Sequence, residues 1–292
     1  MAAPAQPQVT QPPRPGINPG SLLALPLQVL GALFFVVAIP LAFGMEWKNF
    51  VPLFHPDSVR FLAWGVIATA GVSLVAIVLS LPLATGLALG RLARNPALRW
   101  PCVAFIEVVR AVPLLLLIFY INLRVPGLTL FENAKLGDPD SYTTIELTRL
   151  LSHQALAVGL ALTIYTAAVN AELLRAGILS LDRGQDEAAR SLGLSYWQTM
   201  RLVILPQAFQ RTLAPLIAQF TILLKDTSLG SIIGFVELQR RAQILFERDF
   251  NPMEALFLVA LIYFVLNYVL GLSSKLVERR RPTSVKISLS EV

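Results

Sequence analysis

At 292 residues, 55% hydrophobic and 14% charged, with a mean hydropathy of +0.64, the sequence is too apolar for an ordinary soluble domain and predicts an integral membrane protein. The net charge of +6 does not indicate nucleic-acid binding, because the basic residues are spread between apolar blocks and form no patch with aromatic residues. One cysteine and two distant histidines exclude a disulfide framework within the chain and predict neither a metal site nor a bound cofactor.

The first 45 residues divide into a proline-rich part and an uncharged apolar part. Residues 1–20 contain six prolines and a single charge, Arg14, so we expect a disordered cytoplasmic tail that cannot bury enough apolar surface to fold. Residues 21–45 are long enough to span a membrane. They lack the basic cluster and the small-residue cleavage site of a signal peptide, so we expect a retained first helix, with cleavage as the open alternative.

Five further apolar stretches have about the 20 residues that a helix needs to cross a bilayer. They are residues 61–90, 101–123, 153–179, 211–233 and 254–275. The prediction is an all-α polytopic membrane protein with about six transmembrane helices. Its main transmembrane domain is expected at 61–280, with a second cytoplasmic tail at 281–292.

The distribution of lysine and arginine predicts the orientation of these spans. With a cytoplasmic amino terminus, the inner segments hold 13 basic residues and the outer segments 8, which agrees with the positive-inside rule. We therefore expect a multi-pass protein of the cell (inner) membrane, with both termini in the cytoplasm.

The loop between the fourth and fifth spans, residues 184–206, is the most informative part of the sequence. Acidic residues open it, which suits a helix amino terminus, and Gly193 suits the carboxyl cap of a short helix. A second, apolar helix is expected over residues 196–205. From composition alone, a helix lying at the lipid interface is an equally good interpretation. The sequence has no glycine-rich phosphate loop, so any ATP has to be handled by a partner.

The spacing of this loop resembles the EAA loop of the permease subunits of ATP-binding-cassette importers, with valine where the pattern usually has isoleucine. The matching positions are Glu187, Ala188, Ala189, Gly193, Val203, Leu205 and Pro206. Four segments are similar to the polar amino acid uptake branch of these permeases: residues 106–115, 171–178, 205–208 and 224–229. The sequence departs from that branch at Ala111-Val112, which bears on the substrate more than on the family.

This resemblance implies a type I importer permease core. In that family the loop is the coupling helix, which docks on a cytoplasmic ATPase. The implied partners are a second permease subunit, identical or related, two ATP-binding subunits and an extracytoplasmic solute-binding protein, and the implied cargo is a polar amino acid. The implied mechanism is alternating access, in which the permease performs no bond chemistry and is not an enzyme.

Two charged pairs lie toward the cytoplasmic ends of their spans. Glu107 with Arg110, and Glu172 with Arg175, are each three residues apart, so each pair shares one helix face and is partly neutralised. The simpler interpretation is that they are paired anchors at the interface. The functional alternative is that they exchange partners as the helices move.

A polar run, Lys225, Asp226, Thr227 and Ser228, interrupts the fifth span. Counted from Arg211 at 1.5 Å per residue, Lys225 lies roughly 21 Å into the helix, where a charge should face protein or water. Gly230 and Gly234 favour a break in the backbone near it. We expect this run to line the translocation path, with Lys225 as a partner for a substrate carboxylate. An ion-pair lock to another helix is an equal alternative.

Two outer segments carry weaker signals. Residues 237–248 show helical spacing of Leu238, Ala242 and Leu245, which favours a solvated helical cap over a direct role with substrate. The acidic stretch 125–152 is either part of a surface that receives a binding protein or an inert insertion.

Two rival functions use the same residues. An ion-coupled secondary transporter would use Lys225 and Asp226 as coupling groups. A membrane-embedded hydrolase would need Ser228 with Lys225 as nucleophile and base, a weak motif without a recognisable surrounding signature.

Overall fold

The computed structural model describes residues 31, 34, 36–124, 146 and 149–279, with side chains as far as Leu272 on the last helix. The chain divides into two compact units, Met1–Lys48 and Asn49–Val292. Residues 36–42 of the first unit are helical. Most of the predicted span 21–45 and both predicted tails lie outside the described residues. The other five predicted spans and the predicted coupling loop lie in the second unit.

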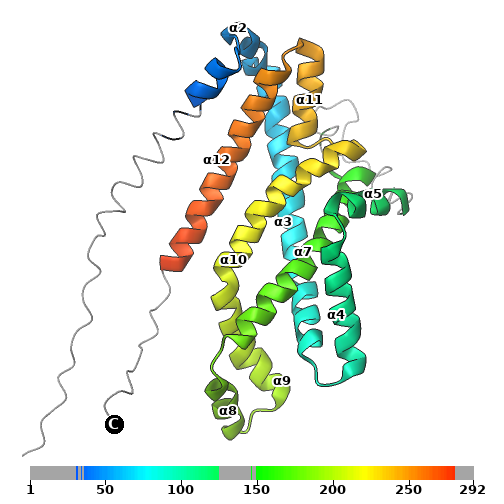
Figure 1. Cartoon of the computed structure of the whole chain (residues 1–292), viewed down its shortest axis with the longest axis vertical. Helices are drawn as coiled ribbons and strands as arrows, with labels where there is room; N and C mark the ends of the chain where they lie inside the picture. Colours follow the sequence, from blue (N-terminus) through cyan, green and yellow to red (C-terminus); the bar gives the residue numbers. More distant parts are fainter. Residues whose placement is uncertain (1–30, 32–33, 35, 125–145, 147–148, 280–292) are drawn as a thin grey trace, which may run out of the picture. The chain divides into compact units, whose positions relative to one another are not determined.

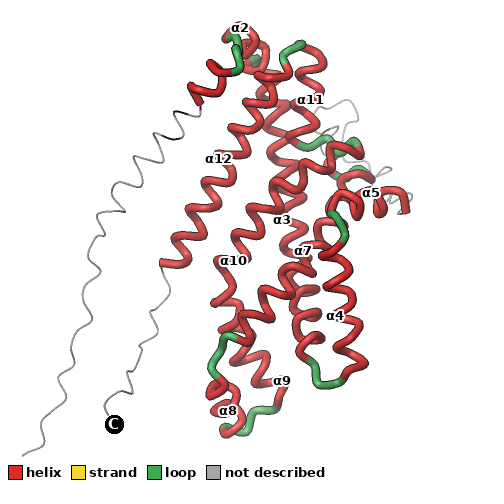
Figure 2. Tube along the Cα trace, in the orientation of Figure 1, coloured by secondary structure: helices red, strands yellow, loops and turns green. Residues whose placement is uncertain are grey.

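Helices and helical turns make up every described element of the second unit (Figure 2), which confirms the predicted all-α class. The short helix α2 (Trp47–Phe50) crosses the boundary between the two units, and the 3-10 turn η1 (Val51–Phe54) follows it. The longer helices are α3 (Pro56–Leu92), α4 (Pro96–Ala111), α5 (Leu114–Arg124), α7 (His153–Leu179), α8 (Arg183–Ser191), α10 (Leu205–Asp226), α11 (Leu238–Asp249) and α12 (Pro252–Arg279). The small helix α9 (Tyr196–Thr199) and a π-helical turn, η2 (Met200–Ile204), precede α10, and a 3-10 turn, η3 (Thr227–Ile233), follows it.

Four stretches of the described chain are long and apolar enough to span a membrane. They are Pro56–Leu92, His153–Leu179, Tyr196–Ile233 and Pro252–Leu272, and the pair α4 and α5 makes a fifth if it counts as one span. Each corresponds to one of the five spans predicted between residues 61 and 275. The third begins well before the predicted residue 211, because the helix continues back through α10 and η2 to Tyr196.

The predicted span over residues 101–123 is not one continuous helix. It consists of α4 and α5, which meet at an angle of 104°. Pro113 lies at the corner, and Val112 before it has an extended backbone with ψ 130°. A residue that precedes proline avoids the α-helical region because the proline ring clashes with it, so the helix has to end at Ala111.

Small residues bring α3 and α7 into the most extensive helix contact of the second unit. Buried alanines such as Ala76 and Ala84 of α3 meet Ala161 and Ala171 of α7 in two hydrophobic clusters. Asn170 Nδ2 donates a hydrogen bond of 3.1 Å to Ser80 Oγ across the same contact. Lipid tails are as apolar as leucine, so membrane helices associate by close packing of small residues and by such hydrogen bonds.

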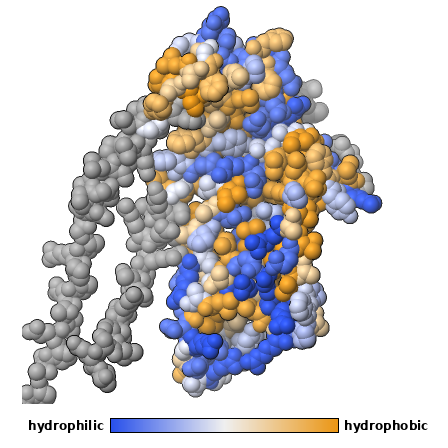
Figure 3. Space-filling view, in the orientation of Figure 1, coloured by the Kyte–Doolittle hydropathy of each residue, from blue (hydrophilic) through white to orange (hydrophobic). Residues whose placement is uncertain are grey.

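Large apolar side chains cover the outer faces of the helices. Leu79 of α3, Val265 of α12 and Leu116 of α5 are each at least half exposed, which would be costly in water and is expected in lipid. Figure 3 shows hydrophobic residues gathered around α5 and many hydrophilic residues at the end that carries α8 and α9. The second unit is a bundle of membrane-spanning helices with a polar end.

Candidate functional site

The predicted coupling loop forms α8, α9 and η2, which we call the coupling segment (residues 183–204), at one end of the bundle (Figure 1). Asp186 lies in the first turn of α8, where the helix dipole favours a carboxylate, and pairs with Arg190 at 3.0 Å. Ala189 is buried, whereas Glu187 and Ala188 are exposed. The helix therefore keeps one face on the bundle and presents Glu187 and Ala188 outward.

Gly193 terminates α8 as its position in the sequence predicts. Its φ of +83° lies in the left-handed region that side chains with a Cβ rarely adopt. The Gly193 amide donates to the Arg190 carbonyl at 2.9 Å, and the Leu194 amide donates to the Ala189 carbonyl at 3.2 Å. These two bonds form a Schellman motif, which satisfies the last carbonyls of the helix and sets the direction of the chain toward α9.

The second helix of the coupling segment begins at the predicted residue 196, but its type changes before residue 205. A capping box between Ser195 and Gln198 starts α9, which changes into the π turn η2 after Thr199. The Leu205 amide then donates five residues back, to the Met200 carbonyl. Pro206 follows directly; its ring would clash with the carbonyl four residues earlier in a regular helix, and the wider turn relieves that contact.

Polar contacts hold the two ends of the coupling segment together. Arg211 of α10 donates to the Ser180 carbonyl at the end of α7 and to Ser180 Oγ, the latter at 3.3 Å. Gln207 of α10 donates to Gln185 Oε1 of α8 at 3.3 Å. These contacts link α8 to α10 and α10 to the end of α7.

Close backbone packing supports the same junction. An added Cβ on Gly177 of α7 would lie 3.2 Å from the Ala208 carbonyl oxygen and 2.5 Å from Thr212 Cγ2, both on α10. Only a residue without a side chain allows α7 and α10 to approach this closely.

Arg91 joins the predicted charged pairs. In the sequence it contributed only to the count of basic residues that predicts the orientation of the spans. Arg91, at the end of α3, forms ion pairs with Glu107 of α4 at 3.0 Å and with Glu172 of α7 at 2.9 Å. Arg175 contacts Glu172 at 3.0 Å, the spacing expected for that pair. Glu107 thus pairs with Arg91 and not with the predicted Arg110, which is exposed. One network ties together α3, α4 and α7.

The polar run Lys225–Ser228 lies where α10 changes into η3. The α-helix ends at Asp226, and the 3-10 turn ends at Gly234, whose φ is +85°. Lys225 is exposed, and no carboxylate on another helix in the described part of the chain pairs with it. Ser228 Oγ donates to the Lys225 carbonyl at 2.7 Å, so its hydroxyl is committed to the backbone and is not poised on the Lys225 amine.

The start of α10 also changes the predicted depth of Lys225. Because α10 begins at Leu205 and not at Arg211, Lys225 lies about 30 Å along the helix from that start. Thr227 beside it is fully buried and donates to the Leu224 carbonyl at 2.8 Å. The run therefore lies near the end of the helix that is remote from the coupling segment, at the junction with η3.

A buried polar cluster lies beneath α11. Glu237 caps this helix, accepting from the Arg240 amide at 2.9 Å, from Tyr263 Oη of α12 at 3.0 Å and from Thr69 Oγ1 of α3 at 3.3 Å. Its side chain is fully buried, and this burial raises the pKa of the Glu237 carboxyl above its ordinary value of 4.5. The cluster joins α11 to α3 and α12.

Arg241 is the second buried charge of α11. It forms an ion pair with Glu146, donates to the Phe61 carbonyl at 3.1 Å and lies over the Phe61 ring at 4.4 Å. The predicted solvated cap is therefore wrong for Glu237 and Arg241, although the predicted helical spacing of Leu238, Ala242 and Leu245 is confirmed by their burial. Most of the acidic stretch 125–152 lies outside the described residues.

Sequence reasoning missed Arg91, Thr69 and Tyr263 as partners of charged groups. Each meets its partner across a long sequence separation: Thr69 is 168 residues from Glu237, for example. Helical spacing finds partners three or four residues apart and carries no signal for these contacts. No cluster of three or more metal-ligating side chains occurs among residues 31–124 and 146–279 where they are described.

Comparison with known proteins places this architecture in a family. Residues 80–282 match the family described as binding-protein-dependent transport system inner membrane component. The chain is 35% identical over 240 residues to the probable glutamine ABC transporter permease protein GlnP of Bacillus subtilis (strain 168), covering 80% of this chain and 99% of that protein. It is 31% identical over 238 residues to the glutamate/aspartate import permease protein GltK of Escherichia coli O6:H1, covering 82% of this chain and 99% of that one.

Solved structures share the fold. One chain from the crystal structure of an amino acid ABC transporter with histidines matches with a TM-score of 0.62 and 31% identity, over 77% of this chain and 96% of that one. The inward-facing methionine ABC transporter MetNI matches with a TM-score of 0.59 at 19% identity, over 78% of this chain and all of that one. The chain therefore belongs to the family of inner-membrane components of binding-protein-dependent transport systems, as a multi-pass membrane protein with the fold of a type I importer permease.

Proposed function

We propose that this protein is the membrane-spanning permease subunit of an ATP-driven importer and that it carries a polar amino acid. The coupling segment is the observation that carries the proposal: its exposed Glu187 and Ala188 offer a docking face, and Gly193 fixes the turn after it. Relatives that match most of the chain are named as glutamine and glutamate/aspartate permeases, which supports an amino acid as cargo.

The coupling segment is the part that receives motion from a cytoplasmic ATP-binding subunit. We place the α8–α9 end of the bundle, and both termini, in the cytoplasm on the excess of basic residues there. The contacts of Arg211 with Ser180 and of Gly177 with Ala208 join α7 to α10, and the hydrogen bond from Gln207 to Gln185 links α10 to α8. A displacement at the docking face is then carried into the membrane, which alternating access requires.

The proposed translocation path runs past the α10–η3 junction. Lys225 offers an exposed ammonium group to a substrate carboxylate, and Asp226, Thr227 and Ser228 contribute polar atoms where the helix type changes. Arg91 of α3 pairs with Glu107 of α4 and with Glu172 of α7, so these charged groups suit an exchange of partners as the three helices move.

The complete importer contains further subunits. We propose a second permease subunit, identical or related, two ATP-binding subunits on the cytoplasmic side and an extracytoplasmic solute-binding protein. The rival secondary transporter is not favoured, because the matching relatives belong to ATP-binding-cassette systems. The rival hydrolase is not favoured either, since the Ser228 hydroxyl is bonded to the Lys225 carbonyl.

Reconstitution of the permease with its ATP-binding and solute-binding partners tests the proposal. We expect uptake of glutamine, glutamate or a related amino acid only with ATP supplied on the α8–α9 side. Glu187→Arg combined with Gly193→Ala should abolish most uptake, because the docking face is reversed in charge and α8 loses its left-handed cap.

Gly184→Ala is the matched control, since Gly184 also lies in the segment but has open space around an added Cβ and no positive φ. It should keep normal uptake. Full uptake by the Glu187/Gly193 double variant, or uptake driven by an ion gradient without ATP, would overturn the proposal.

A further inference from the structure

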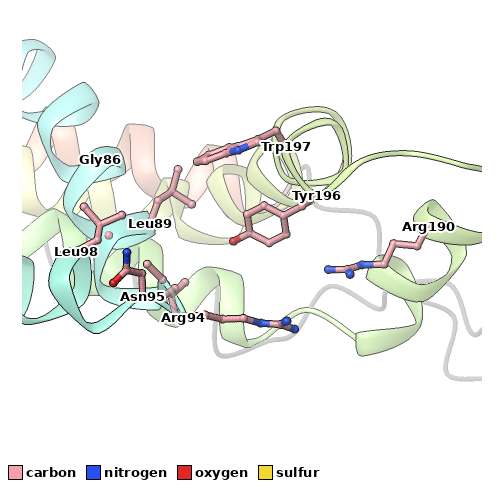
Figure 4. A pocket seen from close by; sticks show the side chains of 11 residues that line it. Gly86, Leu89, Arg94, Asn95, Leu98, Arg190, Tyr196 and Trp197 are labelled. Carbon is pink, nitrogen blue, oxygen red and sulfur yellow. The ribbon is translucent and has the colours of Figure 1, made fainter.

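A pocket of about 600 Å³ opens between the end of α3, the α3–α4 turn and the coupling segment. Arg94 in the turn and Arg190 of α8 point toward one another across it, with Tyr196 and Trp197 of α9 beside them (Figure 4). No part of the proposed docking face or of the Lys225 run lines this pocket. It therefore calls for an explanation of its own.

The pocket carries an excess of positive charge. Two of its lining residues are arginines and none is acidic. Arg190 shares its charge with Asp186 at 3.0 Å, whereas Arg94 is exposed and pairs with no carboxylate in the described part of the chain. Two guanidinium groups that converge on one space are the arrangement that binds a phosphate.

Apart from Asn95 and the aromatic residues of α9, the rest of the lining is apolar, and it continues along the membrane face of α3. Gly86 and Leu89 of α3 and Leu98 of α4 form the inner wall. From Gly86, an exposed stripe leads up α3 through Leu83, Leu79 and Val75, each about half exposed and spaced three or four residues apart. The stripe is about 16 Å long, roughly the depth of one leaflet of the hydrocarbon core.

We propose that this pocket binds an anionic phospholipid, with the phosphate between Arg94 and Arg190 and an acyl chain along the stripe from Gly86 to Val75. The absence of a side chain at Gly86, where an added Cβ would meet nothing within 4 Å, leaves room for the chain to enter. A free phosphate would use the arginines but not the apolar stripe, so the combination favours a lipid. Basic pockets at the interface with flanking tryptophan and tyrosine are suited to anionic headgroups.

The bound lipid would join two parts of the chain that have few other polar contacts. Its headgroup would hold the α3–α4 turn to α8 and α9 of the coupling segment. The proposal concerns lipid binding alone, so its failure would leave the proposed transport function untouched.

Fluorescence of Trp197 gives a direct test on the full chain. The sequence has four tryptophans, and replacing Trp47, Trp64 and Trp100 by phenylalanine leaves Trp197 as the reporter in the pocket wall. The variant is placed in nanodiscs of phosphatidylcholine that contain increasing mole fractions of brominated phosphatidylglycerol or brominated phosphatidylcholine. We expect the anionic lipid to quench Trp197 at a lower mole fraction, by about fivefold for one arginine that contacts it and about 25-fold for two.

Three variants in this background test the charge of the arginines, the space for the acyl chain and a control position outside the pocket. Arg94→Gln with Arg190→Gln should remove the preference for the anionic lipid. Gly86→Phe should remove it as well with all charges kept, because the ring would fill the entrance of the acyl chain. Arg201→Ala, an exposed arginine at the same end that does not line the pocket, is the matched control and should keep the preference.

The emission maximum of Trp197 and the elution profile report whether each variant is folded. Equal quenching by the two brominated lipids, or an unchanged preference in both the arginine and the Gly86 variants, would overturn the proposal. Displacement of the brominated lipid by millimolar inorganic phosphate would overturn it too, since the occupant would then be a free anion.

Discussion

Gly177 of α7 lies so close to Ala208 of α10 that a Cβ on the glycine would be 3.2 Å from the alanine carbonyl oxygen. This contact is next to the coupling segment, at the point where its two flanking helices meet. The leucine side chain in Gly177→Leu should push α7 and α10 apart. We expect it to lower the free energy of unfolding by roughly 1–3 kcal/mol, the usual cost of overpacking. Thermal unfolding in detergent and ATP-driven uptake measure the effect.

Gly71 of α3 provides the control for this substitution. An added Cβ there meets nothing within 4 Å, so Gly71→Leu should leave both unfolding and uptake close to those of the unmodified protein. Equal losses in the two variants would show that the tight α7–α10 contact has no special role.

Arg91 should contribute more to stability than Arg110. Arg91→Met removes the shared partner of Glu107 and Glu172, and the loss should be about 1 kcal/mol or more because the Arg91 and Glu172 side chains are largely screened from solvent. Arg110→Met should have little effect, since Arg110 is exposed. Thermal unfolding of both variants decides: the opposite ranking would restore the pair Glu107–Arg110 that the spacing predicts.

Stability should fall with rising pH because of Glu237. Its pKa is raised by burial, so the folded protein holds the proton in a range where the unfolded chain has already lost it. The contribution is present below the ordinary pKa of 4.5 and is lost as the pH rises from there through the raised pKa. Glu237→Gln should flatten the dependence of the melting temperature on pH above 4.5.

Glu247 on the same helix serves as the control for this pH dependence. Its side chain is 60% exposed, so Glu247→Gln should keep the slope of the unmodified protein. A slope that persists in Glu237→Gln would assign the titration to another group.

Substitution of Lys225 should change the apparent substrate affinity more than the maximal rate. Loss of a charged hydrogen-bond donor to a carboxylate predicts that Lys225→Met raises KM for uptake about tenfold or more. Lys225→Arg keeps the charge and should retain most of the affinity. Initial rates of uptake over a range of substrate concentration provide the measurement, and an unchanged KM in Lys225→Met would remove Lys225 from the translocation path.

Sequence reasoning succeeded where local rules decide the structure. Helix α7 begins and ends at the predicted residues 153 and 179, because Ser152 caps its first turn and an apolar run fills its length. Gly193 ends α8 for a reason that is equally local, its positive φ.

Long-range contacts account for the parts that the sequence did not reveal. The spacing of Glu107 and Arg110 is compatible with a pair, yet Arg91 lies closer in space and takes Glu107. On α11 the apolar positions were visible, but Arg241 occupies the same buried face and needs Glu146, 95 residues away, to balance its charge. From the sequence alone, a charged residue on such a face is expected to be exposed to solvent. Only its distant partner explains why it is buried.

The bend between α4 and α5 was not predicted, although its cause is present in the sequence. Pro113 and the restriction it places on Val112 are local. The span was predicted from the apolar run over residues 101–123 alone. Hydropathy shows how long an apolar stretch is, but not whether its helix bends.

The π turn η2 changes the direction in which the residues before it face. A π turn holds one residue more than an α turn, so residues before Met200 are rotated by about 100° relative to the helical wheel of α10. A single-residue deletion within 200–204 would close the turn into regular helix and rotate α9 around its own axis. Tyr196 and Trp197, both on α9, would then turn together away from the pocket wall, without any substitution of either aromatic residue.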